Sequence, residues 1–171
     1  MNIRDLLLTE LDKECQDTRK FLALLPAGKT DWKPADKSMT LGRLAMHLAE
    51  LSGWGNTILG TDTFTLDLSQ FKPTAARAAQ EALKTFDETA EKFRTALAST
   101  TEQHLAGNWK MVWEDREVVS GPRAGVLHNF VFFHMVHHRA QLGVYYRLLG
   151  IAIPGVYGPS ADDKSKSAAA S

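Results

Sequence analysis

The sequence has little cysteine and no excess of either charge, and each absence excludes a class of protein. The single cysteine among 171 residues, Cys15, excludes an internal disulfide and a cysteine-based zinc site. Lysine and arginine together number 20, as do aspartate and glutamate, so the net charge is zero. No basic stripe stands out either, and we therefore expect no nucleic-acid partner.

Long apolar runs are also absent. No run is long enough to span a bilayer, and residues 1–5 lead directly into an amphipathic pattern rather than into a signal peptide. We therefore expect no membrane partner and a cytoplasmic location. The length and the 44% hydrophobic content are typical of a single domain with an ordinary core.

Apolar residues recur at helical spacing in four long segments. This periodicity predicts helices over residues 2–25, 41–59, 73–97 and 127–150, the last one opening near Pro122. Residues 60–72 are predicted to be a loop that covers part of the bundle, and the alternation in residues 109–119 predicts a short β-hairpin. The fold expected is all-α, an up-down four-helix bundle over residues 1–158, followed by a small, polar, disordered tail over residues 159–171.

The last predicted helix carries two histidines in the centre of its apolar stripe. His134 and His138 are four residues apart, so they share one face of the helix. Each ring can be a neutral core histidine with a hydrogen-bond partner, because a buried polar group without one costs roughly 1–3 kcal/mol. Two such rings one turn apart can also converge on one metal ion. This helix alone leaves both interpretations open.

A third inward histidine, His47, stands at the centre of the stripe of the second helix. Three inward histidines from two helices of a small bundle favour a shared metal site. Glu50 and Gln141 are the nearest inward polar residues and are candidates to accept hydrogen bonds from the ligand rings. Trp54 and Tyr145 flank the predicted site and are candidates to line a substrate pocket, or simply to pack in the core.

Three neighbours of these histidines are assigned other roles. His137 is the competing ligand, but it lies roughly 60° off the stripe, which places it at a bundle edge or a dimer surface. Arg139 lies on the outward side, where it serves helix packing or a dimer contact. Met135 occupies the position at which the HExxH motif of zinc proteases has its glutamate, so peptidase activity is disfavoured.

The chain resembles the DinB-like family of small metal-binding helical bundles, also called the DinB/YfiT-like metalloenzymes. The resemblance rests on His47 within LAMHLAEL and on the HxxxHRxQ pattern of residues 134–141, and it covers residues 1 to about 158. It implies that His47, His134 and His138 bind a divalent metal, commonly zinc or nickel, with water at the open positions. It also implies a homodimer.

The chemistry of such a site suggests an enzyme that acts on a small-molecule substrate. Three imidazoles leave zinc at least one open position, which is typical of a catalytic site, although nitrogen ligands also suit nickel, copper or iron. The family includes transferases and isomerases that use a low-molecular-weight thiol, so thiol-dependent S-transfer and hydrolysis are the leading reactions. The alternative is a non-catalytic, stress-related metal-binding bundle, and the catalytic groups beyond the metal and its water are not identified.

Overall fold

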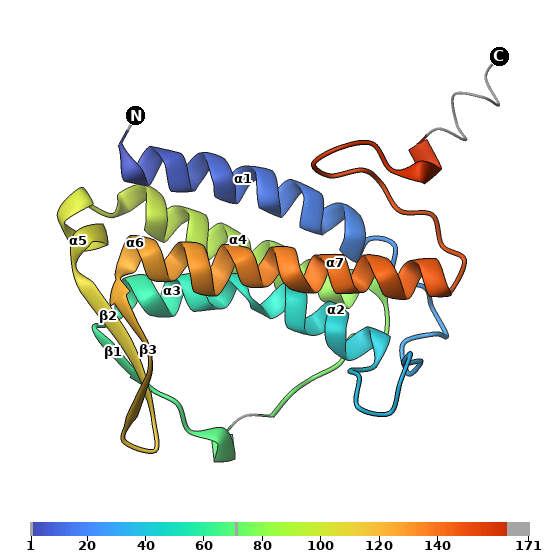
Figure 1. Ribbon diagram of the computed structural model, residues 1–171, viewed down its shortest axis with the longest axis horizontal. Coiled ribbons are helices and arrows are strands. Elements are labelled where there is room, and N and C mark those ends of the chain that lie inside the picture. Colours follow the sequence, from blue (N-terminus) through green and yellow to red (C-terminus); the bar gives the residue numbers. More distant parts are fainter. Residues whose placement is uncertain (1, 71, 164–171) are drawn as a thin grey trace.

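The computed structural model describes residues 2–70 and 72–163, in which four helical rods run side by side (Figure 1). The first rod is α1, Ile3–Leu22, and the third is α4, Ala79–Ser99. The second rod joins α2, Leu41–Glu50, to α3, Ser52–Gly60. The fourth joins α6, Arg123–Val126, the π-helix η2, Leu127–Phe132, and α7, Phe133–Leu148. The predicted four-helix bundle is confirmed.

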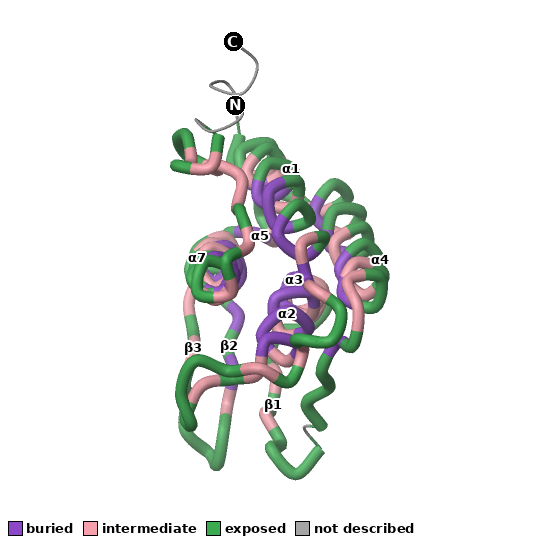
Figure 2. Tube along the Cα trace, turned by 90° about the vertical axis from the view of Figure 1, so that its right-hand side faces the viewer, coloured by how far each residue is buried: buried purple, intermediate pink, exposed green. Residues whose placement is uncertain are grey.

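The apolar stripes of the rods form the core, and Figure 2 shows the buried residues on the inner sides of the helices. On α1, four stripe residues are at most 4% exposed: Leu7, Leu11, Phe21 and Leu22. The helix begins at the N-cap Asn2, whose side-chain oxygen accepts a hydrogen bond from the backbone N–H of Asp5 at 2.8 Å. Helical periodicity therefore predicts α1 to within one residue at its start and three at its end.

The second rod is interrupted at Leu51, whereas the sequence predicts one helix over residues 41–59. The N–H of Trp54 bonds to the carbonyl of Leu51 at 3.1 Å, a tight turn at which α3 begins. A Cβ atom on Gly55 would lie only 2.4 Å from the ring of Phe93. Glycine at this position therefore allows α3 to approach α4 closely, at the cost of a weaker helix.

The third helix begins at Ala79 rather than at Pro73, where the sequence predicts it. Residues 73–78 lie outside any helix, and the N–H of Ala76 donates to the carbonyl of Gly42 at 3.0 Å. A Cβ atom on Gly42 would lie 2.3 Å from the carbonyl oxygen of Ala76. The segment is therefore held against the start of α2 instead of extending α4.

A small sheet covers one end of the bundle. Its strands are β1, Thr63–Thr65, β2, Asn108–Trp113, and β3, Arg116–Pro122, in the order β1-β2-β3. Strands β2 and β3 are antiparallel, and Glu114 and Asp115 form their turn with φ of 47° and 60°. The predicted hairpin is confirmed, while β1, which pairs parallel with β2, lies in the segment predicted to be a loop. The short helices η1, Leu68–Gln70, and α5, Glu102–Ala106, flank β1 and β2.

The fourth rod contains a π-helical segment that the sequence does not predict. The six residues of η2 lie between α6 and α7, and the rod then continues to Leu148. Gly150 follows with φ of 72°, the left-handed conformation that favours glycine after a helix. The predicted end of this helix at Gly150 therefore holds to within two residues.

The chain after α7 returns along the bundle toward α1 (Figure 1). Residues 159–163 were predicted to be disordered, but Asp163 accepts hydrogen bonds from the backbones of Gly155 and Ser160 at 3.1 and 2.7 Å. The remainder of the predicted tail, residues 164–171, lies outside the described residues. Within residues 2–70 and 72–163, no helix is both long and apolar enough to cross a membrane.

Candidate metal centre

The side chain of His47 projects from α2 beside α7. The helix begins at Thr40, whose hydroxyl oxygen accepts a hydrogen bond from the N–H of Arg43 at 3.2 Å. Leu44 and Leu48 are buried in the core, and His47 lies at the edge of their face with part of its surface exposed. The second helix therefore presents an imidazole at the boundary between core and solvent.

His134 and His138 meet His47 from α7. The ring centroids of His134 and His138 are 4.7 Å apart. The ring centroid of His47 lies 5.2 Å from that of His134 and 4.5 Å from that of His138. One nitrogen from each ring lies within 4.8 Å of the other two. Among residues 2–70 and 72–163, this is the only group of three metal-ligating side chains with such spacing. The structure thus brings together the three predicted ligands so that they could hold one ion.

The three rings are poorly suited to carrying a proton at neutral pH. Burial, and to a smaller extent the charges of His138 and Arg43, lower the pKa of His47 to about 4. Burial also lowers the pKa of His138 to about 4, and it lowers the pKa of His134. A neutral imidazole keeps a free electron pair, which is the form that binds a metal.

Two of the rings have hydrogen-bond partners that suit ligation. Nδ1 of His138 lies 2.7 Å from the side-chain oxygen of Gln141. Because that oxygen only accepts, Nδ1 carries the proton and Nε2 is left available. The ring of His134 forms a hydrogen bond with the backbone of Phe130, which opposes the lowering of its pKa. Such outer partners commonly fix the orientation of metal-binding histidines, so these two rings fit a metal as they stand.

His47 has a different neighbour, because an arginine nitrogen of Arg43 lies 3.4 Å from its Nδ1. A guanidinium group only donates, so Nδ1 accepts and the ring proton is on Nε2. Arg43 is held in place by Glu50 at 3.1 Å and by the carbonyl of Thr74 at 3.0 Å. A metal on either nitrogen of His47 would therefore compete with this hydrogen bond. Arg43 is not among the residues predicted from the sequence, although its spacing of four residues from His47 places both on one helix face.

A cavity of about 360 Å³ opens onto two of the histidines, a volume at the lower end of the range for small-molecule sites. Its lining residues are His47, Glu50, Leu51, Trp54, Leu66, Leu68, Lys72, Pro73, Phe130 and His134. They come from the second rod, from the segment around β1 and η1, and from the fourth rod. The cavity thus gives a small molecule access to the predicted metal site.

A larger hollow, of about 670 Å³, lies between α1 and α4 and contains none of the histidines. It is lined in part by Cys15, which packs partly buried against the core. Burial raises the pKa of its thiol to about 12, so the thiolate is scarce at neutral pH. This hollow therefore has less of the chemistry of an active site than the smaller cavity, despite its size.

The four residues predicted to support the ligands or to line a pocket have separate outcomes. Gln141 contacts His138 directly, whereas Glu50 reaches His47 only through Arg43, since its carboxylate binds Arg43 and the hydroxyl of Thr74. Trp54 lines the cavity, where its ring meets Phe130 edge-on at 5.5 Å. Three of the four candidates therefore lie at the site or its cavity.

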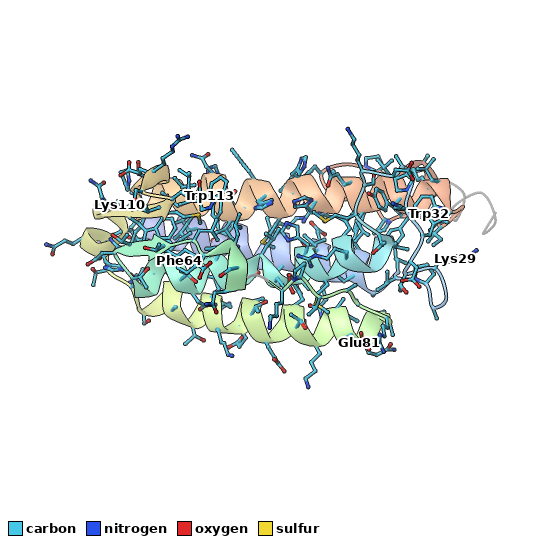
Figure 3. The ribbon with its side chains drawn as sticks, turned by 90° about the horizontal axis from the view of Figure 1, so that it is seen from below. Lys29, Trp32, Phe64, Glu81, Lys110 and Trp113 are labelled. Atoms are coloured by element: carbon cyan, nitrogen blue, oxygen red, sulfur yellow. The ribbon has the colours of Figure 1, made fainter. Side chains whose placement is uncertain are left out.

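Tyr145 does not line the cavity. Its ring packs edge-on against Trp32 at 5.6 Å, and its hydroxyl donates to the carbonyl of Met39 at 3.2 Å. Figure 3 shows Trp32 at the opposite end of the bundle from Phe64, the ring that contacts Trp54. The reason is helical rise, because seven residues beyond His138 correspond to about 10 Å along α7.

His137 and Arg139 lie on opposite sides of α7. His137 is exposed, as predicted, although its ring centroid lies 4.8 Å from that of His138. Arg139 is only 2% exposed and forms an ion pair with Glu14 at 2.7 Å. It therefore contributes to helix packing through a buried ion pair that joins α7 to α1. Tyr157 completes this network, because its hydroxyl accepts from Arg139 and donates to Glu14.

Comparison with known proteins agrees with the resemblance seen in the sequence. The model of the DinB family matches residues 1–168. The uncharacterized protein YrdA of Bacillus subtilis is 27% identical over 167 residues, which cover 95% of this chain and 92% of YrdA. The match therefore spans nearly the full length of both proteins.

Solved structures show the same architecture at lower identity. A DinB-like protein from Bacillus cereus has a TM-score of 0.69 and 23% identity, over 88% of this chain and 95% of its own. YfiT from Bacillus subtilis, a probable metal-dependent hydrolase with an unusual four-helix bundle topology, has a TM-score of 0.64 and 15% identity, over 87% of this chain and 89% of its own. These likenesses show a shared fold. Since the family model covers nearly the whole sequence, this chain belongs to the DinB family.

Proposed function

We propose that this protein is a metal-dependent enzyme that acts on a small molecule, with His47, His134 and His138 as ligands of one divalent metal. The observation that carries the proposal is the cluster of three neutral rings, two of which, His47 and His134, line a cavity. No carboxylate or thiol of the described residues joins the cluster as a fourth ligand. Three protein ligands leave a position for substrate, which favours a catalytic site over the non-catalytic alternative.

Zinc and nickel are the metals we expect, because imidazole nitrogen suits both. When bound, such an ion supplies Lewis acidity and lowers the pKa of a coordinated water to about 7. The chain itself would orient the ligands, through Gln141 at His138 and the backbone of Phe130 at His134. The apolar wall that includes Trp54 and Phe130 would keep bulk water away from the reacting bond.

Hydrolysis is the reaction we favour. It needs only the metal, water and a bound substrate, and a protein of the same fold, YfiT, is a probable metal-dependent hydrolase. S-transfer would in addition require a low-molecular-weight thiol as a second substrate. Both reactions would use the same metal position. They differ in their need for a thiol, so assays with and without a thiol separate them.

The test is an activity panel on the purified chain loaded with zinc or with nickel. One arm contains carboxylic esters, amides and lactones, and the other an electrophile with glutathione, mycothiol or bacillithiol. We expect hydrolysis that a chelator abolishes and that His138→Ala lowers at least a hundredfold, with His137→Ala as the matched control. Activity that persists in His138→Ala would contradict the proposal, and zinc binding without turnover in either arm would favour the non-catalytic alternative.

We also propose that the protein is a homodimer that pairs through α7. Phe133, Val144 and Leu148 are 54%, 58% and 61% exposed, and their spacing of eleven and four residues places them on one face with His137. Large exposed apolar side chains that recur along one face of a helix favour an interaction surface there. Light scattering should show a dimer that Val144→Glu converts to a monomer, and a monomeric unmodified chain would contradict the proposal.

A further inference from the structure

The cavity beside the histidines has an apolar wall that metal binding does not require. Six of its ten described lining residues are apolar, and they come from the second rod, the segment after β1 and the fourth rod. The ring of Trp54 is held edge-on between Phe64 at 5.2 Å and Phe130 at 5.5 Å. These contacts fix the aromatic part of the wall, so it forms a surface ready to receive an apolar group.

Among the described residues, two charged side chains line the same cavity, and of these only Glu50 has a partner of opposite charge. The carboxylate of Glu50 binds Arg43 at 3.1 Å and accepts a hydrogen bond from the hydroxyl of Thr74 at 3.1 Å. Lys72 is exposed and has no ion pair or hydrogen bond with any other residue in the described part of the chain. As far as its described residues show, the cavity therefore combines an apolar wall with the unpaired positive charge of Lys72.

We infer that the substrate of the proposed enzyme is a small amphiphilic acid with an aryl or alkyl body and a single anionic group. The body would pack against Trp54 and Phe130, and the anionic group would pair with Lys72. The reacting bond would then face His47 and His134 on the floor of the cavity. A peptide-like thiol carries several charged and polar groups and matches this wall poorly, which is consistent with hydrolysis. The inference rests on the proposed function only in naming this ligand the substrate.

Calorimetric titration of the metal-free full chain tests the inference with three probes of one shape: 4-phenylbutyrate, 4-phenylbutanol and 4-phenylbutylamine. We expect the acid to bind at least fivefold more tightly than the amine, with the alcohol between them. Equal affinities, or a preference for the amine, would overturn the inference. Metal-free protein is used because a zinc ion would itself attract the carboxylate.

Two variants assign the contacts. Lys72→Met should lower the affinity for the acid about fivefold and leave that for the alcohol unchanged. Lys92→Met, on the exposed face of α4, is the matched control and should change neither. Leu68→Gln alters a side chain that is 51% exposed, so the fold should persist, and it should weaken the acid and the alcohol alike, about threefold. An acid preference that survives Lys72→Met would overturn the assignment of the anionic contact.

A parallel measurement separates this inference from the proposed function. Zinc content of the unmodified chain and of His47→Ala reports on the metal site alone. Selective binding of 4-phenylbutyrate without any zinc binding would support the inferred ligand class and contradict the proposed metal site. Zinc binding without selectivity among the three probes would support the metal site and contradict the inferred ligand class.

Discussion

Nδ1 of His138 lies 2.7 Å from the side-chain oxygen of Gln141, three residues later on the same helix. This contact decides which nitrogen of the ring can bind a metal, because the amide oxygen requires a proton on Nδ1. The last two polar positions of the HxxxHRxQ pattern thus have distinct physical roles. Gln141 orients a ligand, while Arg139 forms a buried ion pair on the other side of the helix.

Loss of the Gln141 amide should weaken metal binding. We expect Gln141→Leu to raise the Kd for zinc about tenfold, because Nδ1 of His138 loses its acceptor and the ring its orientation. Gln141→Glu, which keeps an acceptor oxygen at the same reach, should retain the affinity. Competition titration with a chromophoric chelator measures both, and an unchanged Kd in Gln141→Leu would show that the contact does not orient the ligand.

Arg43 should oppose metal binding. Its guanidinium donates to Nδ1 of His47, so the ion has to displace it or shift the ring proton toward it. We expect Arg43→Gln, whose amide oxygen can accept from Nδ1, to lower the Kd for zinc about tenfold. Arg19→Gln, which breaks an exposed ion pair with Asp87, is the control and should leave the Kd unchanged. Weaker binding in Arg43→Gln would instead mean that the arginine supports the site.

The metal-free protein should lose stability as the pH falls. The pKa of His47 and of His138 is about 4 in the folded chain and about 6.5 in the unfolded chain. Between these values the unfolded chain binds more protons, so the free energy of unfolding decreases as the pH is lowered from about 6.5 to about 4. Urea denaturation at several pH values should show this decrease, and His47→Gln should reduce it. A decrease of equal size in His47→Gln would contradict the assignment, while His137→Gln serves as an exposed control.

Removal of only one partner of the buried ion pair between Arg139 and Glu14 should strongly destabilise the fold. Arg139→Met leaves the buried carboxylate of Glu14 without its charge partner and should lower the free energy of unfolding by about 3 kcal/mol. The double variant Arg139→Met/Glu14→Leu should recover most of that loss. Arg94→Met breaks an exposed pair with Asp12 and should cost no more than about 1 kcal/mol. If Arg139→Met lowered the free energy of unfolding by no more than about 1 kcal/mol, the pair would behave like an exposed ion pair and the prediction would be wrong.

Local patterns predict much of this fold and the candidate site. The period of 3.6 residues places His134 and His138 on one face without knowledge of any neighbour. Polar rings at core positions in two different helices are hard to satisfy separately, and this made a shared site with His47 the better hypothesis. The hairpin is similarly local, since its two strands are joined by a turn of two residues, Glu114 and Asp115.

Features that depend on contacts between residues far apart in the chain could not be predicted from the sequence. The parallel pairing of β1 with β2 joins residues more than 40 positions apart, and residues 73–78 leave the helix to bond with Gly42. Arg139 lies on the side of α7 opposite His134, which suggests solvent, but α1 covers that side. A helical wheel ranks the faces of one helix, and it does not show how many neighbours surround that helix.

The central claim is that His47, His134 and His138 hold one metal ion, and elemental analysis of purified protein tests it most directly. After incubation with zinc or nickel and removal of the excess, the unmodified chain and His137→Ala should each retain about one ion per chain. His47→Ala and His138→Ala should retain almost none while keeping their helical circular dichroism. Metal content that is unchanged in both of these variants would contradict the account.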